Sequence, residues 1–269
     1  MILKIFNFRL LLNNLYMFVQ YFDFIIYKTR ADLRAEVRRF YVSYLWWILD
    51  PILNMIIFYI VFGLLMHKKQ PDFVPFLLIG IVTWRWYAAS VAHASMSMIQ
   101  AKMILLKVNI PKIILPLVDF LADTFKFFIV FAILIIFLHV YGFSFSYSYF
   151  FLSYVFFVHA VHTICIGFVC SAIVPFLQDV KFIIDHLLHL QFFISGIFFD
   201  IKAIPEQYSI FISFNPMAVI IQSYRDILMG NHAPDILHLT YILIISVTIW
   251  AFTIQIISHY DKAYPREIS

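Results

Sequence analysis

Residues 100–116 read QAKMILLKVNIPKIILP, a short amphipathic segment between two long apolar runs. The segment carries Lys102, Lys107 and Lys112 and is closed by two prolines. Short loops of a membrane protein that are rich in lysine and arginine face the cytoplasm. The segment is therefore predicted to be cytoplasmic, which fixes the sidedness of the rest of the chain. A compact cytoplasmic helix between two spans is also an element that a soluble motor can push.

The composition around this segment is that of a polytopic membrane protein. Of the 269 residues, 64% are hydrophobic and 13% are charged, and the mean hydropathy is +0.92. A soluble domain carries about a quarter charged residues. No polar stretch is long enough to form a soluble domain, so we expect one membrane domain with short connections. The opening segment contains Lys4 and Arg9 and no small-residue cleavage site, which argues against a cleavable signal peptide.

Six hydrophobic runs reach the about 20 residues that a helix needs to span the hydrocarbon. They are residues 46–66, 73–99, 117–138, 149–174, 180–199 and 236–258. The sequence thus predicts an all-α fold in two parts, a cytoplasmic N-terminal segment (1–45) and a domain of six transmembrane helices (46–269). Residues 200–235 are too many for a tight turn and too apolar for an ordinary loop. The break at Asn215-Pro216 within them predicts two short helices that dip part-way into the outer leaflet.

The distribution of lysine and arginine supports this topology. With both termini in the cytoplasm, thirteen of these residues lie on the cytoplasmic side and four outside, while Arg85 and Lys126 lie within spans. The cytoplasmic residues are Lys4, Arg9, Lys28, Arg30, Arg34, Arg38, Arg39, Lys102, Lys107, Lys112, Lys181, Lys262 and Arg266. The outer residues are Lys68, Lys69, Lys202 and Arg225. The bias agrees with six spans and cytoplasmic termini, and the net charge of +4 is no indication of nucleic-acid binding.

Residues 21–41 predict an amphipathic helix that lies in the membrane interface. Apolar residues recur in it at intervals of three, four or seven, while Arg30, Arg34 and Arg38 follow one another at intervals of four. Arginines placed in this way lie at the depth of the lipid headgroups. Two interpretations remain open: a basic collar that only orients the chain, and a site that grips an anionic lipid head.

Arg85 lies inside a predicted span with Trp84, Trp86 and Tyr87 beside it. An arginine at that depth needs a partner or water. Aromatic rings next to hydrogen-bonding groups would suit a sugar chain, because the apolar face of a pyranose stacks on a ring while its hydroxyls bind polar groups. The alternative is an interfacial aromatic belt, which is common in membrane proteins. In the next span, Asp123 can pair with Lys126 three residues later, and a satisfied intrahelical pair is the simpler interpretation there.

Four histidines form two pairs on the fourth and fifth spans, His159 with His162 and His186 with His189. A four-ligand metal site or an intramembrane hydrolase is conceivable from such pairs. Counted from the turn between the spans, however, the pairs lie about 12 Å apart in depth. No serine or aspartate motif accompanies them. Interhelical hydrogen bonding or contact with an aqueous cavity is therefore preferred, and no metal is expected.

The chain has no recognisable nucleotide site. It contains six glycines and no G-x-x-x-x-G-K-[ST] motif, so it lacks the loop that cradles phosphates in P-loop proteins. If ATP drives this protein, a partner subunit binds and hydrolyses it. We therefore expect no cofactor and no enzymatic activity in the chain itself.

The order of these parts resembles the membrane subunits of ABC-2 type exporters, in particular those for O-antigen, capsule and teichoic acid. Residues 38–53, RRFYVSYLWWILDPIL, resemble the family's entry into the first span, and residues 76–87, FLLIGIVTWRWY, resemble its second span. KVNIPKIILPL at 107–117 is similar to its coupling segment, and QDVKFI at 178–183 to its short fourth turn. Residues 193–230 resemble its periplasmic gate through Ile-Pro-Glu, Asn-Pro and Tyr-Arg at fitting spacings, which is the most specific match.

The resemblance implies a homodimer in the bacterial inner membrane, with two copies of an ABC ATPase beneath it and a channel at the dimer interface. The implied cargo is a polysaccharide on an isoprenoid diphosphate carrier, O-antigen before capsule or teichoic acid. A permease for another lipid or for a drug is the nearest alternative. An intramembrane enzyme built on the histidine pairs is the alternative from another class.

The resemblance also assigns roles to four sets of residues. Arg30, Arg34, Arg38 and Arg39 would draw the carrier head group, and Trp84, Arg85, Trp86 and Tyr87 would line the substrate path. Lys102, Lys107, Pro111 and Lys112 would take the push from the ATPase. Pro205, Glu206, Asn215, Pro216, Tyr224 and Arg225 would form the periplasmic gate.

Overall fold

The computed structural model of the chain describes residues 19–39, nine residues between 45 and 61, and residues 72–108, 110–201 and 215–267. Its helices are α2 (Phe22–Arg39), α4 (Phe73–Gln100), α5 (Lys102–Leu105), α6 (Ile114–Tyr141), η3 (Tyr147–Phe151), α7 (Leu152–Ile173), α8 (Val180–Ile194), α10 (Pro216–Leu228), α11 (Ile236–His259) and α12 (Tyr264–Glu267). The described residues contain no strand, so the all-α prediction is confirmed for them.

Four of these elements are long and apolar enough to cross a membrane: α4, α6, η3 with α7, and α11. They correspond to the predicted spans at 73–99, 117–138, 149–174 and 236–258. The protein is therefore a polytopic membrane protein.

The other two predicted spans are not confirmed. The run at 180–199 forms α8, which ends at Ile194 after 15 residues. At about 1.5 Å per residue α8 is about 22 Å long, less than the about 30 Å of hydrocarbon. It stops early because the chain turns at Gly196, whose φ of 71° is a conformation that favours glycine. The run at 46–66 falls mostly outside the described residues, so a total of six spans stays a prediction.

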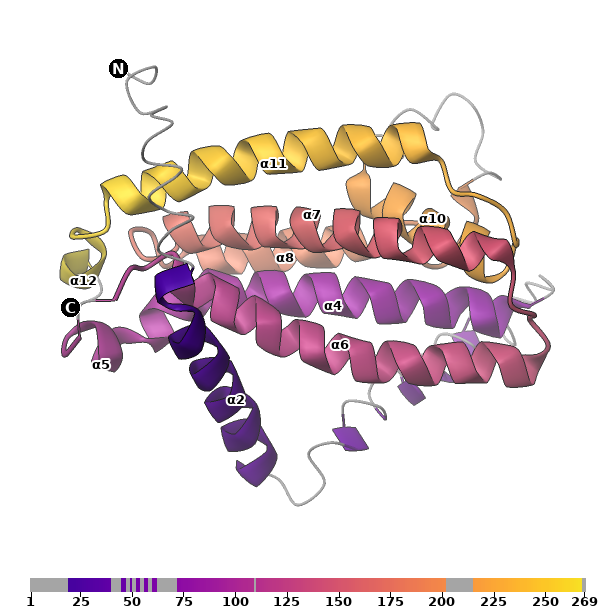
Figure 1. Ribbon diagram of the computed structural model, residues 1–269, viewed down its shortest axis with the longest axis horizontal. Coiled ribbons are helices and arrows are strands. Elements are labelled where there is room, and N and C mark those ends of the chain that lie inside the picture. The colour runs from indigo at the N-terminus through magenta and orange to yellow at the C-terminus, as the bar shows by residue number, and fades with distance from the viewer. Residues whose placement is uncertain are drawn as a thin grey trace.

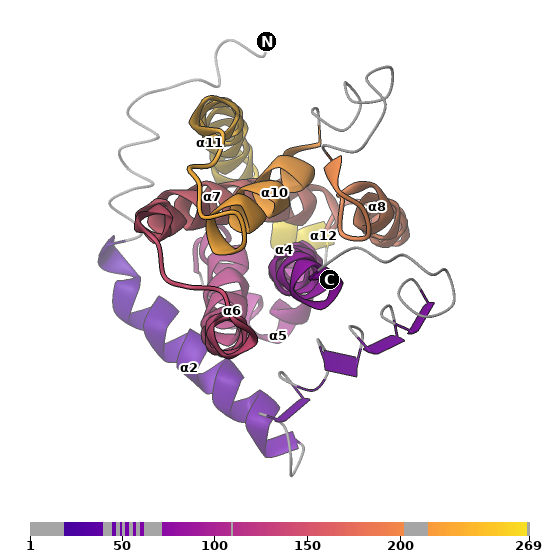
Figure 2. The ribbon, with the colours of Figure 1, turned by 90° about the vertical axis from the view of Figure 1, so that its right-hand side faces the viewer.

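Helix α4 lies at the centre of the bundle. Figure 1 shows α4, α6, α7 and α11 side by side along the long axis, and Figure 2, seen from the α10 end, shows the other helices around α4. Helix α4 contacts α6, α7, α8 and α10. Of an apolar stretch of 18 residues in α4, 78% is buried, whereas 22% of the corresponding stretch is buried in α6 and 33% in α11. The outer helices therefore present most of the apolar surface that lipid or a second subunit would cover.

Small residues set the distance between α4 and α7. A Cβ added at Gly167 of α7 would lie 3.0 Å from the Cβ of Ala94 on α4. Small side chains at such a crossing let two helix backbones approach closely, which is a main source of stability where no hydrophobic effect drives helices together. Gly167 thus allows α7 to pack directly on the central helix.

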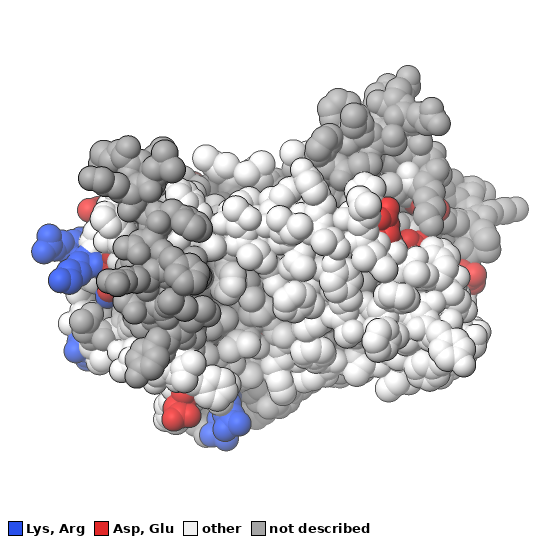
Figure 3. Space-filling view, turned by 45° about the horizontal axis from the view of Figure 1, so that its top comes forward, with Lys and Arg blue, Asp and Glu red and all other residues white. Residues whose placement is uncertain are grey.

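On one face of the bundle, the charged side chains lie toward the ends (Figure 3). Figure 3 shows one face on which the lysines and arginines gather toward the end with α5 and α12, while the middle of the same face shows no charged side chain. Helix α2 crosses the bundle obliquely near that end (Figure 1). This pattern is typical of a protein with a membrane-embedded middle and a basic cytoplasmic end.

Candidate functional site

Arg225 ties α10 to the neighbouring ends of α4 and α8. Its side chain is 3% exposed. The guanidinium donates to the carbonyl of Gly196 at 2.7 Å, to those of Phe76 and Ile197 at 3.1 Å, and again to Phe76 from Nε at 3.3 Å. It also lies over the Phe76 ring, 3.4 Å from the centroid, in cation–π geometry. One buried side chain thereby satisfies carbonyl groups of two other elements.

Asn215 joins the same region from the start of α10. Its Oδ1 accepts a hydrogen bond from the backbone N–H of Met217 at 3.2 Å, which caps the helix. Its Nδ2 donates to the Ile194 carbonyl at 3.2 Å and to Ser195 Oγ at 3.0 Å, at the end of α8. Gln191 of α8 donates to Asn215 Oδ1 at 3.3 Å. The start of α10 and the end of α8 are therefore held together by side-chain bonds.

The structure describes four of the six predicted gate residues. Asn215, Tyr224 and Arg225 are buried, and Pro216 occupies the first turn of α10, where a missing N–H is harmless. The Tyr224 hydroxyl lies 3.5 Å from His159 Nδ1 in the bundle core. Pro205 and Glu206 lie outside the described residues, as does the first half of the predicted hairpin. Gating itself stays a prediction.

The predicted aromatic path residues divide between the subunit core and its cavities. Trp86 is 2% exposed and lies in a stack of rings, with centroids 4.3 Å from Phe127 and 5.1 Å from Phe156. Tyr87 is 3% exposed, stacks on His162, and donates a hydrogen bond to Gln191 at 3.1 Å. Both rings already have partners inside the subunit. Burial of this kind gives them a packing role, and a role in the substrate path stays a prediction.

Arg85 and Trp84 line a cavity between α4 and α8. The cavity has a volume of about 460 Å³, and its polar lining comes from Arg85, Asp185 and His189. Trp84 and Phe192 provide its aromatic lining, with ring centroids 5.8 Å apart. This is the combination of stacking rings and hydrogen-bonding groups that the sequence predicts for a sugar chain.

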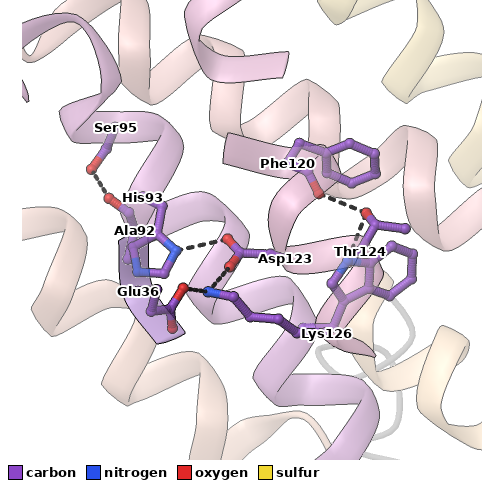
Figure 4. A network of polar contacts seen from close by, with 9 residues as sticks. Glu36, Ala92, His93, Ser95, Phe120, Asp123, Thr124 and Lys126 are labelled. Carbon is purple, nitrogen blue, oxygen red and sulfur yellow. Dashed lines mark hydrogen bonds and ion pairs between the residues drawn. The ribbon is translucent and has the colours of Figure 1, made fainter. Parts of the chain in front are cut away.

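A second cavity lies on the other side of Arg85, between α2, α4 and α6. It has a volume of about 270 Å³, and Trp86 lines it together with Arg85. Lys126 Nζ lies 2.6 Å from Glu36 of α2 and 3.4 Å from Asp123, and Asp123 lies 2.7 Å from His93 Nδ1 (Figure 4). The intrahelical pair of Asp123 with Lys126 is therefore confirmed, and it is part of a network that reaches two further helices.

The predicted head-group arginines lie on α2. Arg30 and Arg34 are both exposed and flank a shallow surface pocket on one face of the helix. The opposite face packs on the bundle through Ile25 and Thr29, which are 3% and 8% exposed. Nothing is described for the side chains of Arg38 and Arg39. Recognition of a carrier head group by these arginines stays a prediction.

The predicted coupling segment forms α5 and the turn before α6. Lys107 is exposed, Lys102 and Pro111 are partly buried, and the apolar Met103, Leu106 and Val108 are 64%, 55% and 54% exposed. The segment thus presents apolar and basic side chains together at the end of the bundle. Contact of this segment with an ATPase stays a prediction.

Lys112 is buried, unlike the other residues of the predicted coupling set. Its side chain is 3% exposed, and Nζ lies 2.9 Å from Asp261 Oδ2 in the turn between α11 and α12. The Lys112 backbone N–H donates to the other oxygen of the same carboxylate at 3.0 Å. Lys112 therefore anchors the segment to the C-terminal turn and does not present its charge to a partner.

The histidine pairs lie in different environments. His159 and His162 are buried on α7, the latter 3.1 Å from Ser246 Oγ, while His186 and His189 are exposed on α8. In the described part of the chain, no three His, Cys, Asp or Glu side chains gather as metal ligands. The first pair thus contributes to packing between helices, in line with the preferred interpretation.

Several residues of these sites did not stand out in the sequence. Asp261, Gln191 and Glu36 act through partners far away in the chain, and no local pattern signals such contacts. Gly80, in contrast, could have been recognised from the sequence, since it is one of six glycines and lies inside a predicted span. A glycine there indicates close approach of another group, which is the Arg225 guanidinium.

Comparison with known proteins gives relatives along most of the chain. It is 27% identical over 247 residues to the O-antigen export system permease protein RfbA of Klebsiella pneumoniae, covering 90% of this chain and 92% of that protein. It is 25% identical over 235 residues to RfbA of Myxococcus xanthus, covering 86% and 90%. It is 24% identical over 215 residues to the polysialic acid transport protein KpsM of Escherichia coli, covering 78% and 83%.

The family described as ABC-2 type transporter matches residues 27–229, which is more than half of the chain. This range runs from within α2 to just after α10 and includes Arg225. The chain therefore belongs to the ABC-2 type transporter family.

Proposed function

We propose that this chain is the membrane subunit of an ABC exporter that carries a lipid-linked polysaccharide, O-antigen in the first place, across the bacterial inner membrane. Both termini would be cytoplasmic, and the subunit would work as a homodimer above two copies of a separate ATPase. The similarity to O-antigen export permeases over 86–90% of the chain is the observation that carries the proposal. ATP would be bound by the partner subunits alone.

The face formed by α4 and α8 is the proposed wall of the conduit. Helix α8 exposes His186 and His189, and the cavity beside it contains Arg85 and Asp185. Ionisable residues at membrane depth face a bundle interior or a water-filled space, because hydrocarbon solvates them poorly. A second subunit across an aqueous path would accommodate these ionisable residues better than lipid would. Trp84 and Phe192 would give the path a stacking surface.

The end with α5 and α12 is the proposed docking site for the ATPase. Met103, Leu106 and Val108 expose apolar surface there beside Lys107. The Lys112–Asp261 pair would transmit a displacement of this segment to α6 and α11 together. At the opposite end, α10 and its Arg225 contacts would close the outer mouth of the path.

The test replaces a small residue of the conduit wall with a bulky one. Ala88 lines the α4–α8 cavity, and Ala132 is an exposed residue of α6 away from it. A strain that lacks the protein is supplied with the wild type, Ala88→Trp or Ala132→Trp, and surface polysaccharide is measured. Ala88→Trp should abolish export while the protein inserts normally, and Ala132→Trp should restore it.

Two outcomes would count against the proposal. If deletion leaves surface polysaccharide unchanged, the cargo is another lipid or a drug, which is the second candidate. If deletion removes the polysaccharide but Ala88→Trp exports it as well as Ala132→Trp does, the α4–α8 face is not the conduit. Accumulation of lipid-linked glycan in the cytoplasmic leaflet of the deletion strain would support the export step directly.

A further inference from the structure

The cavity between α2, α4 and α6 concentrates ionisable side chains in an apolar bundle. Glu36, Arg85, His93, Asp123 and Lys126 all line its about 270 Å³, with Trp46 at its edge. Polar groups of this kind in a membrane protein are costly unless they pair or bind something, so they mark a functional site. Nothing in the proposed conduit or gate uses this set as a whole.

The charges of the cavity come from two different sources. The two bundle helices supply Arg85, His93 and Lys126 but only one carboxylate to the lining, Asp123, which bonds His93 at 2.7 Å and Lys126 at 3.4 Å. The other carboxylate, Glu36, comes from the peripheral helix α2. Without Glu36, the fixed wall of the cavity carries more positive than negative charge. Asp119, one turn from Asp123, lines a separate cavity beside Lys28 and Asp32.

Glu36 is the more replaceable partner of Lys126. Its side chain is 39% exposed, whereas those of Lys126 and Asp123 are 18% and 4% exposed. Helix α2 has its buried anchors, Ile25 and Thr29, two to three turns earlier, so its contact with the bundle through Glu36 lies far from them. A partly solvated ion pair of this kind is worth little, about 0–1 kcal/mol. A ligand with more negative charge can therefore compete for Lys126.

We infer that this cavity is a binding site for a phosphate-bearing anion, and that Glu36 occupies the place of that anion in the ligand-free subunit. A diphosphate displaces the Glu36 carboxylate from Lys126 and accepts hydrogen bonds from Lys126, Arg85 and His93. Charge-assisted bonds to phosphate oxygens are stronger than neutral ones. The identity of the lipid that carries the diphosphate rests on the proposed function, whereas the binding of phosphate in this cavity does not.

Displacement of Glu36 also has a mechanical consequence. The Glu36–Lys126 pair joins α2 to α6, so a ligand that takes Lys126 releases this contact. A ligand shifts a conformational equilibrium by the difference in its affinity for the two states. Here the anion binds the state in which Glu36 has left Lys126. Binding of the cargo's anion therefore loosens the contact between α2 and α6.

The test measures binding to the purified full chain in discs of neutral phosphatidylcholine, without any ATPase. The probes are inorganic pyrophosphate and farnesyl diphosphate, which share the diphosphate and differ in the isoprenoid tail. Glu36→Gln should tighten binding about three- to tenfold, because it removes the competing charge. Lys126→Gln should weaken binding about tenfold or more. Lys262→Gln, an exposed lysine in the turn between α11 and α12, is the matched control and should change affinity less than about twofold.

Each result decides the matter. Tighter binding by Glu36→Gln supports the site even where Lys126→Gln folds poorly, because misfolding does not raise affinity. If pyrophosphate binds as farnesyl diphosphate does, the phosphates are recognised by themselves; if only farnesyl diphosphate binds, the anion is a lipid head. If Glu36→Gln leaves both affinities unchanged, or Lys262→Gln weakens them as much as Lys126→Gln does, the cavity is not the site. This experiment does not measure export, so a negative result would rule out the binding site without contradicting the proposed function.

Discussion

Gly80 makes room for Arg225: a Cβ added to Gly80 would lie 2.8 Å from Nη2 of the Arg225 guanidinium. Real Cβ atoms essentially never come that close to another atom. The guanidinium could therefore not keep its observed position if residue 80 had a side chain. The glycine on α4 therefore permits the contacts that hold α10 against α4 and α8.

Gly80→Ala should destabilise the protein by about 1–3 kcal/mol, because the guanidinium must leave its carbonyl partners or the helices must separate. Thermal unfolding of the purified protein in detergent measures this. Arg225→Ala is the background that isolates the cause: in it, the added methyl meets only Ile197, at an ordinary contact distance of 3.4 Å, and the effect of Gly80→Ala should nearly vanish. Equal effects in both backgrounds would show that the clash is not the reason.

Asn215 has two functions that different substitutions separate. Asn215→Ala removes both the cap of α10 and the bonds to α8, and should lower stability by about 1–2 kcal/mol. Asn215→Ser keeps an oxygen for the Met217 N–H but loses the donors to Ile194 and Ser195. We expect the serine variant to lie between alanine and the wild type in thermal unfolding. A serine variant as unstable as alanine would assign the whole effect to the bonds with α8.

Asp261→Asn should destabilise the end with α5 and α12, because it leaves the buried Lys112 ammonium without a carboxylate. Asp261 is itself 28% exposed, which reduces the effect to about 1–3 kcal/mol. Lys107→Gln, an exposed change in the same segment, is the control and should be neutral. Thermal unfolding compares the two variants, and equal melting temperatures would contradict a structural role for the pair.

Gly167→Val should push α7 away from α4, since even a single Cβ at this position meets Ala94 at 3.0 Å. Overpacking at such a crossing destabilises by about 1–3 kcal/mol. Ala94→Gly opposite the valine should restore part of the loss, because it removes the methyl group that valine meets. The melting temperatures of the single and double variants measure this rescue, and its absence would place the strain elsewhere.

The aromatic motif shows where sequence reasoning reaches its limit. TWRWY marks Arg85 as unusual, and the structure does place it beside two cavities. The same motif suggests that the neighbouring rings line the same path, but Trp84 and Trp86 line different cavities and Tyr87 packs inside the subunit. All faces of these helices are apolar, so periodicity does not distinguish a ring that faces the core from one that faces a conduit.

The sequence by itself determined the class of protein, four of the spans and the family, because each of these depends on local properties. Apolar runs of sufficient length form helices in a membrane whatever surrounds them. The tertiary structure alone decided which polar groups meet. Lys112 and Asp261 are 149 residues apart in the chain, as are Arg225 and Phe76. A buried charge is satisfied by whichever group the packing brings near, and the packing depends on the whole chain.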